Sequence, residues 1–197
     1  MAQPQRLVVL ISGRGSNMEA LLQAAQRRRW AARWGAQVVA VLSNRPQAQG
    51  LQVAAQHGVA TEVVDHQAYS SREAFDVALA QAIDAHQPTL VLLAGFMRVL
   101  GAGFVARYQG RLLNIHPSLL PAFAGLNTHA RALQAGCEVA GATVHWVDEG
   151  LDSGAIVAQA VVPVLPADTP ETLGQRVLAA EHRLYPRAVE RVLAAGL

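Results

Sequence analysis

Apolar runs rich in β-branched residues alternate with longer alanine- and leucine-rich segments along this chain. Such alternation is typical of strand–helix units built around a mainly parallel sheet. The predicted strands span residues 6–12, 37–43, 61–64, 89–94, 112–116, 142–147 and 155–164. The predicted helices span residues 17–29, 46–57, 70–86, 103–108, 129–136 and 170–195. Because each of the first four strands leads toward a helix, the sequence predicts a doubly wound α/β fold.

The last two predicted strands are separated only by residues 148–154, so we expect them to form an antiparallel hairpin at one edge of the sheet. The 197 residues, 52% hydrophobic and 15% charged, suffice for one well-buried core and indicate a single domain over residues 1–197. No apolar run is long enough to cross a membrane, and the N-terminus lacks the features of a signal peptide. The lone Cys137 suits a reducing compartment, and we expect a cytoplasmic protein with no membrane partner.

The basic residues are all arginine, because the sequence contains no lysine. This composition excludes Schiff-base, pyridoxal-phosphate and P-loop lysine chemistry. The formal net charge of +2 is small and the arginines are scattered, which argues against a nucleic-acid partner. The sequence also lacks the motifs of serine hydrolases and zinc enzymes, and no metal is expected.

Three polar clusters follow predicted strands, at residues 13–17, 95–98 and 114–118. Open parallel sheets bind ligands beyond the carboxyl ends of their strands, so we expect these clusters to converge on one site. In the first cluster, glycines and the start of a helix would let backbone amides reach a phosphate. The same residues are compatible with an ordinary glycine turn in which Ser16 or Asn17 caps the helix.

Asn114 and His116 are the main candidates for catalysis. They are one residue apart on a predicted strand, so both side chains point to the same face. An amide and an imidazole in this arrangement can stabilise one oxyanion, as acyl transfer requires. Asp152, in the glycine-flanked loop before the last strand, can favour the imidazolium form of His116. The alternatives are a structural histidine on an apolar strand and an ordinary turn aspartate.

Five motifs occur in order and with the spacing of a known family: Gly15-Ser16-Asn17, LAGFMRVL from Leu93, LLNIHPSLLPAF from Leu112, GATVHWVDEGLDSG from Gly141, and Glu181-His182. Over nearly the whole chain, the sequence resembles the glycinamide ribonucleotide transformylases, folate-dependent enzymes of purine synthesis. These enzymes transfer a formyl group from 10-formyltetrahydrofolate to 5'-phosphoribosylglycinamide. The Asn-x-His and Leu-Asp pattern is shared by all folate formyl-transfer and formyl-hydrolysis relatives, so it indicates the chemistry more strongly than the acceptor.

The resemblance implies a formyltransferase fold with a ribonucleotide-binding N-terminal half and a folate-binding C-terminal half. Gly15, Ser16 and Asn17 would hold the phosphate, and Glu181 would help position the glycinamide part. The residues implied around the folate are Arg72, Met97, Arg98, Val99, Leu100, Asn114, Asp148, Glu149, Gly150, Leu151 and Asp152. Asn114 would lie at the formyl group, His116 would be the general acid, and Asp152 would be its partner. The resemblance also implies a cis peptide bond before Pro121.

Two other enzymes share this chemistry: formyltetrahydrofolate deformylase, which uses water as acceptor, and methionyl-tRNA formyltransferase. These usually carry an additional N-terminal or C-terminal domain, and none is expected here, so the resemblance favours the ribonucleotide acceptor. From another class, a non-catalytic folate- or nucleotide-binding module of the same fold is an alternative. The expected partners are the two small-molecule substrates, and the expected assembly is a monomer or a weak homodimer.

Overall fold

A computed structural model of the chain describes residues 4–196. Its strands form one seven-stranded sheet in the order β3-β2-β1-β4-β5-β6-β7. The strands are β1 (Gln5–Ile11), β2 (Ala36–Ser43), β3 (Ala60–Val63), β4 (Leu90–Leu93), β5 (Leu112–His116), β6 (Val139–Trp146) and β7 (Ile156–Pro163). Strands β1 to β5 run parallel, whereas β6 is antiparallel to both β5 and β7. The predicted mainly parallel α/β sheet with an antiparallel edge hairpin is confirmed.

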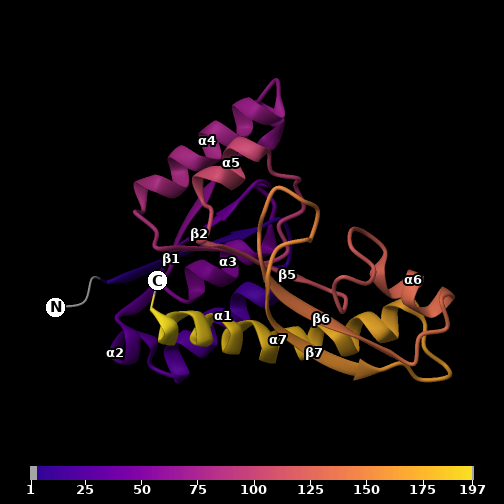
Figure 1. Ribbon diagram of the computed structural model, residues 1–197. Helices are drawn as coiled ribbons and strands as arrows, with labels where there is room; N and C mark the ends of the chain where they lie inside the picture. Colours follow the sequence, from indigo (N-terminus) through magenta and orange to yellow (C-terminus); the bar gives the residue numbers. More distant parts are fainter. Residues whose placement is uncertain (1–3, 197) are drawn as a thin grey trace.

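Helices cover both faces of this sheet (Figure 1). They are α1 (Ser16–Arg27), α2 (Trp30–Trp34), α3 (Gln49–Gln56), the short 3-10 helix η1 (His66–Ala68), α4 (Arg72–Ala85), α5 (Ala102–Arg107), α6 (Thr128–Gln134) and α7 (Pro170–Ala195). One apolar core joins α1, α2, α3 and α7 to one face of the sheet. A second core joins α4 and α5 to the other face. Within residues 4–196, no helix is both long enough and apolar enough to cross a membrane.

Helix α7 spans the predicted range of residues 170–195. Its start is fixed by Thr169, whose hydroxyl accepts a hydrogen bond from the Thr172 N–H, and by a proline at the first helical position. Its buried Tyr185 lies under the sheet and donates a hydrogen bond to the Leu93 carbonyl, 3.1 Å away. The helix also packs against α1, and this contact brings Glu181 next to Asn17 at the start of α1.

The structure differs from the predicted helix over residues 17–29. Helix α1 ends at Arg27, and the short helix α2 begins after Arg29, which has a left-handed φ of 55°. Trp30 is fully buried, and its indole N–H donates to Glu190 on α7, 2.8 Å away. The break therefore depends on a contact between distant parts of the chain, which the local helical pattern does not encode.

Strand β6 begins at Val139, three residues before the predicted start at residue 142. The added residues include Gly141, and glycine is generally unfavourable inside a strand. In the structure this glycine is needed, because a Cβ at position 141 would lie far too close to the Ala160 carbonyl oxygen of β7. The hairpin therefore continues through the glycine.

Candidate active site

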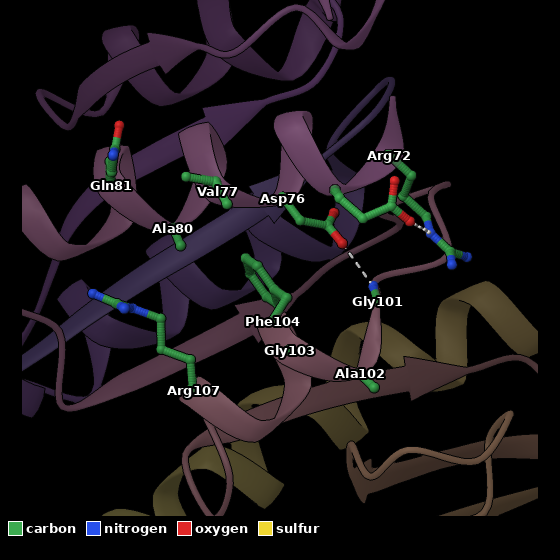
Figure 2. A pocket seen from close by; sticks show the side chains of 11 residues that line it. Arg72, Asp76, Val77, Ala80, Gln81, Gly101, Ala102, Gly103, Phe104 and Arg107 are labelled. Carbon is green, nitrogen blue, oxygen red and sulfur yellow. Dashed lines mark hydrogen bonds and ion pairs between the residues drawn. The ribbon is translucent and has the colours of Figure 1, made fainter. Parts of the chain in front are cut away.

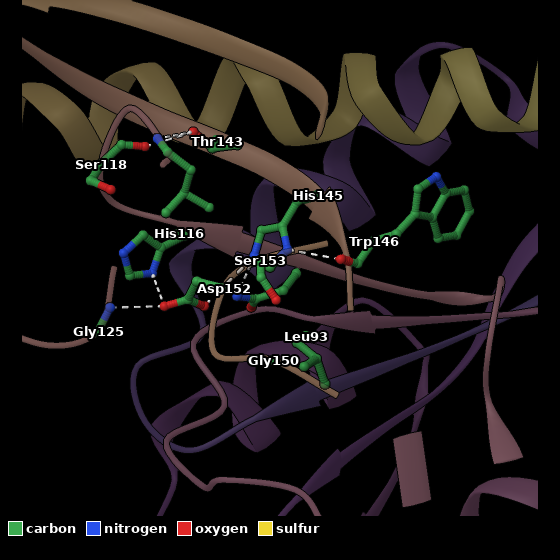
Figure 3. Close-up of polar contacts among 12 residues, drawn as sticks. Leu93, His116, Ser118, Gly125, Thr143, His145, Trp146, Gly150, Asp152 and Ser153 are labelled. Carbon is green, nitrogen blue, oxygen red and sulfur yellow. Dashed lines mark hydrogen bonds and ion pairs between the residues drawn. The ribbon is translucent and has the colours of Figure 1, made fainter. Parts of the chain in front are cut away.

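His116 and Asp152 meet at the carboxyl end of β5 (Figure 3). The His116 Nδ1 atom lies 3.3 Å from Asp152 Oδ2, and both side chains are largely buried. The same carboxylate oxygen accepts a hydrogen bond from the Gly125 N–H at 2.9 Å. Asp152 has a φ of 51°, so a turn in the left-handed region directs its carboxylate toward the sheet. The structure thus brings together the two residues that the sequence analysis paired.

The other ring nitrogen of His116 also faces an acceptor. Its Nε2 atom lies 3.1 Å from the carbonyl oxygen of Phe123. A carbonyl can only accept, and a carboxylate accepts when ionised, so both partners favour a ring nitrogen that carries a proton. Both ring nitrogens of His116 therefore face oxygen acceptors.

Asn114 lies on the same strand and contacts a histidine that the sequence analysis did not select. The Asn114 amide nitrogen lies 3.2 Å from His145 Nε2, and the two residues are register partners in the β5–β6 pair. His145 Nδ1 lies 2.9 Å from the carbonyl oxygen of Trp146, so Nδ1 carries the proton and Nε2 accepts from Asn114. Burial lowers the pKa of His145, which keeps this ring neutral.

His145 also lies close to Asp152, and the neutral state of its ring determines whether the two form an ion pair. Its Nε2 atom lies 3.7 Å from Asp152 Oδ1. An uncharged ring whose Nε2 accepts a hydrogen bond from Asn114 makes no ion pair with a carboxylate at that distance. Asp152 is therefore paired with His116, and His145 is paired with Asn114. His145 was not predicted as a site residue, because its place beside Asn114 follows only from the pairing of β5 with β6.

The turn that follows His116 is hydrogen-bonded to β6. The Leu120–Pro121 peptide bond is cis, as the resemblance implied. The Thr143 hydroxyl, fully buried on β6, donates to the Ser118 carbonyl at 2.7 Å and accepts from the Leu120 N–H at 3.0 Å. These hydrogen bonds hold the end of β5 in a fixed position.

The glycine loop after β1 adopts a compact turn. Gly15 is the N-cap of α1 and has a φ of 76°, a conformation that favours glycine. A Cβ at Gly15 would lie 2.8 Å from Gly50 Cα, so the loop also packs too closely for a side chain. Neither Ser16 nor Asn17 caps the helix with its side chain, which corrects that interpretation of the loop. Phosphate binding by Gly15, Ser16 and Asn17 remains a prediction.

Asn17 and Glu181, 164 positions apart in sequence, are joined by a hydrogen bond of 2.6 Å from the Asn17 amide to Glu181 Oε2. The Glu181 side chain lies on α7 and is only 6% exposed. Burial raises the pKa of Glu181, and the hydrogen bond from Asn17 opposes that change. Two residues predicted to bind the ribonucleotide therefore form one buried pair.

The residues predicted around the folate lie on three segments. Arg72 begins α4, and residues 97–100 precede α5. Met97 and Val99 are each 66% exposed, whereas the Arg98 guanidinium lies over the Phe75 ring at 5.3 Å.

The third segment is the loop over residues 148–152. Asp148 Oδ1 accepts hydrogen bonds from the Gly150 N–H at 3.1 Å and from the Ser153 hydroxyl at 2.7 Å. Leu151 is 66% exposed, and Glu149 is also exposed. Their contact with a folate remains a prediction.

Comparison with known proteins identifies close relatives. The sequence profile of the formyl transferase family matches residues 5–189. The phosphoribosylglycinamide formyltransferase of Escherichia coli is 46% identical over 183 residues, which cover 93% of this chain and 84% of that protein. The trifunctional purine biosynthetic protein adenosine-3 of Drosophila melanogaster is 50% identical over 185 residues, and this chain spans only 14% of its length.

Solved structures agree with the sequence relatives. The crystal structure of phosphoribosylglycinamide formyltransferase from Brucella melitensis has a TM-score of 0.89 and 52% identity, and covers 99% of this chain and 98% of that one. The glycinamide ribonucleotide transformylase 1 of Geobacillus kaustophilus has a TM-score of 0.89 at 38% identity. The resemblance inferred from the motifs is thereby confirmed, and the chain belongs to the formyl transferase family.

Proposed function

We propose that this protein transfers the formyl group of 10-formyltetrahydrofolate to the amine of 5'-phosphoribosylglycinamide, a step of purine biosynthesis. The observation that carries the proposal is the buried pair of His116 and Asp152, 3.3 Å apart, beside Asn114 at the end of β5. Relatives 46% and 52% identical to this chain are named phosphoribosylglycinamide formyltransferase. As this chain spans only part of the trifunctional relatives, any wider activity of such proteins is not assigned to it.

In the proposed mechanism, the amine of the glycinamide attacks the formyl carbon and the carbonyl electrons move to its oxygen. Asn114, whose amide has a second N–H beyond the one directed at His145, donates to that oxygen. Imidazolium His116, beside Asp152, stabilises the same negative charge. The C–N bond to the folate nitrogen then breaks, and a proton from the amine passes to that nitrogen, through water held by Asp152. The residues proposed for these steps are an amide, an imidazole and a carboxylate.

The phosphorylated acceptor is supported by the glycine loop and the Asn17–Glu181 pair. The backbone amides at the start of α1 would donate to phosphate oxygens. Gly15, the N-cap, has no side chain to block the approach of the phosphate. The Glu181 carboxylate, held by Asn17, would accept hydrogen bonds from the glycinamide part. A cytoplasmic location and a monomeric or weakly dimeric state remain part of this proposal.

The test is to incubate the purified protein with 10-formyltetrahydrofolate, with and without 5'-phosphoribosylglycinamide, and to measure tetrahydrofolate release. We expect release only when the ribonucleotide is present, together with stoichiometric formylated product. Release without the ribonucleotide would instead identify a deformylase, and no release in either case would identify a non-catalytic binding module. Glycinamide riboside, which lacks the phosphate, should be a poor acceptor if the glycine loop binds phosphate.

A further inference from the structure

The segment 97–101, which precedes α5 and contains most of the predicted folate residues, is held at both ends. At its start, the Met97 N–H donates to Ser12 Oγ on the β1 side, at 2.7 Å. At its end, the Gly101 N–H donates to Asp76 Oδ2 on α4, also at 2.7 Å. Between these two hydrogen bonds the segment exposes Val99 to solvent. The segment therefore contacts α4 at two points, through the Gly101–Asp76 hydrogen bond and through Arg98 over the Phe75 ring.

Asp76 is an unusual residue for the face of α4 that packs on the sheet. It is only 7% exposed, and its Oδ1 atom is buried with no hydrogen-bond partner within residues 4–196. Burial raises the pKa of Asp76, while the Gly101 N–H and the positive charges of Arg72 and Arg98 oppose that rise. A buried carboxyl group with one unpartnered oxygen costs stability, so its presence indicates a role other than packing.

The geometry around Gly101 shows how closely the two elements meet. Figure 2 shows Asp76 pointing from α4 across to Gly101 at the start of α5, with Arg72 beside them. A Cβ at Gly101 would lie 2.9 Å from Asp76 Oδ2 and 4.0 Å from Arg72 Nε. Gly101 has a φ of −74°, which other residues adopt without strain, so the constraint at this position is the nearby carboxylate.

A cavity of about 490 Å³ lies between α4 and α5 next to this contact. Its lining includes Arg72 and Asp76 from α4, and Gly101 and Phe104 from the opposite side. Beside this cavity, the Asp76–Gly101 hydrogen bond links α4 to the residue that precedes α5. Losing that link would let segment 97–101 move away from Arg72.

We propose that Asp76 is a positioning residue for the folate substrate: by holding Gly101, it sets segment 97–101 at a fixed distance from Arg72. This inference rests on the proposed function. Asp76 acts through these neighbours and does not itself contact substrate. The residues proposed for chemistry lie on β5 and in the loop at Asp152, and the Asn17–Glu181 pair lies on α1 and α7. A loosened segment 97–101 should therefore weaken folate binding selectively.

The test compares the Michaelis constants of the two substrates. In Asp76→Ala we expect the KM for 10-formyltetrahydrofolate to rise by about tenfold, the loss typical of a hydrogen bond to a charged group. The KM for 5'-phosphoribosylglycinamide and kcat should stay within about twofold of wild type. Asp76→Asn keeps an oxygen that can accept from the Gly101 N–H, so its folate KM should rise less than that of Asp76→Ala.

A second variant disturbs the Asp76–Gly101 hydrogen bond at Gly101. It tests the inference independently if Asp76→Ala does not fold. Gly101→Ala adds a methyl group 2.9 Å from Asp76 Oδ2, and should raise the folate KM by displacing the carboxylate. In Asp76→Ala/Gly101→Ala the contact is already lost and space is available, so the double variant should be no worse than Asp76→Ala alone. The matched control is Val77→Ala, a neighbouring exposed residue of α4 that also lines the cavity.

The outcomes separate this inference from the proposed function. Wild-type activity with both substrates establishes the transferase, and its absence would refute the proposed function directly. With an active wild type, an unchanged folate KM in Asp76→Ala and Gly101→Ala would overturn the role of Asp76. Equal changes in both Michaelis constants, or strictly additive effects in the double variant, would also overturn it.

Discussion

Asn114 and His145 face each other across the antiparallel β5–β6 pair, with the amide nitrogen 3.2 Å from His145 Nε2. The Trp146 carbonyl, 2.9 Å from His145 Nδ1, fixes the ring so that Nε2 can only accept. The Asn114 amide is therefore held with its nitrogen toward the histidine. Its orientation, and the direction of its second N–H, depend on a neighbour outside the reacting groups.

Replacing His145 should therefore slow the reaction through Asn114. In His145→Phe the ring is kept, but the acceptor for the Asn114 amide is lost. We expect kcat to fall by about tenfold to a hundredfold, because a misdirected donor no longer meets the oxyanion, while both Michaelis constants change little. Steady-state kinetics measure this, with the exposed His57→Phe as control. An unchanged kcat in His145→Phe would show that Asn114 does not need this partner.

Asp152→Asn tests the charge beside His116 with little structural disturbance. Asparagine tolerates the left-handed φ of 51° at this position and can still accept the Gly125 N–H, so folding should be preserved. The negative charge 3.3 Å from His116 Nδ1 is lost. We expect kcat to fall on the order of a hundredfold, with smaller changes in substrate binding and an unchanged thermal midpoint. A loss confined to substrate binding would contradict the assigned role of Asp152.

Glu181→Gln should separate stability from function. Because burial raises the pKa of Glu181 above its ordinary value of 4.5, the ionised carboxylate destabilises the folded protein at neutral pH. Glutamine removes this cost and can still accept the hydrogen bond from Asn17. We expect a higher thermal midpoint than wild type at pH 7, and a weaker binding of 5'-phosphoribosylglycinamide.

The stability difference between Glu181→Gln and wild type should depend on pH. As the pH falls through 4.5, wild-type Glu181 becomes protonated in both the folded and the unfolded chain, so the advantage of Glu181→Gln should shrink toward zero. Thermal unfolding of both proteins from pH 4 to pH 8 measures the difference. A difference that is absent at pH 7, or that grows as the pH falls, would contradict this account of Glu181.

Much of this arrangement is predictable from sequence, because periodicity and glycine loops are local signals. The strand–helix alternation predicts the parallel sheet, and the β5 motif places Asn114 and His116 on one face. The proline-started helix at Pro170 is predicted with its observed bounds. These features depend on neighbours within a few positions of each other.

The remaining features depend on contacts between distant segments. The break before Trp30 requires Glu190, and the role of His145 follows only once β6 is known to pair with β5. Phe123 and Gly125 contact His116 and Asp152 through backbone groups, which carry no residue-type signal. Local patterns do not predict such contacts, because each needs the tertiary arrangement of two elements.

We propose that His116, paired with Asp152, stabilises charge on the formyl oxygen during transfer. The most direct measurement is the rate of formyl transfer by His116→Ala at saturating concentrations of both substrates, alongside its dissociation constant for 10-formyltetrahydrofolate. We expect a rate loss on the order of a hundredfold or more, with a dissociation constant close to that of wild type. Near-normal turnover in a folded His116→Ala protein would contradict it.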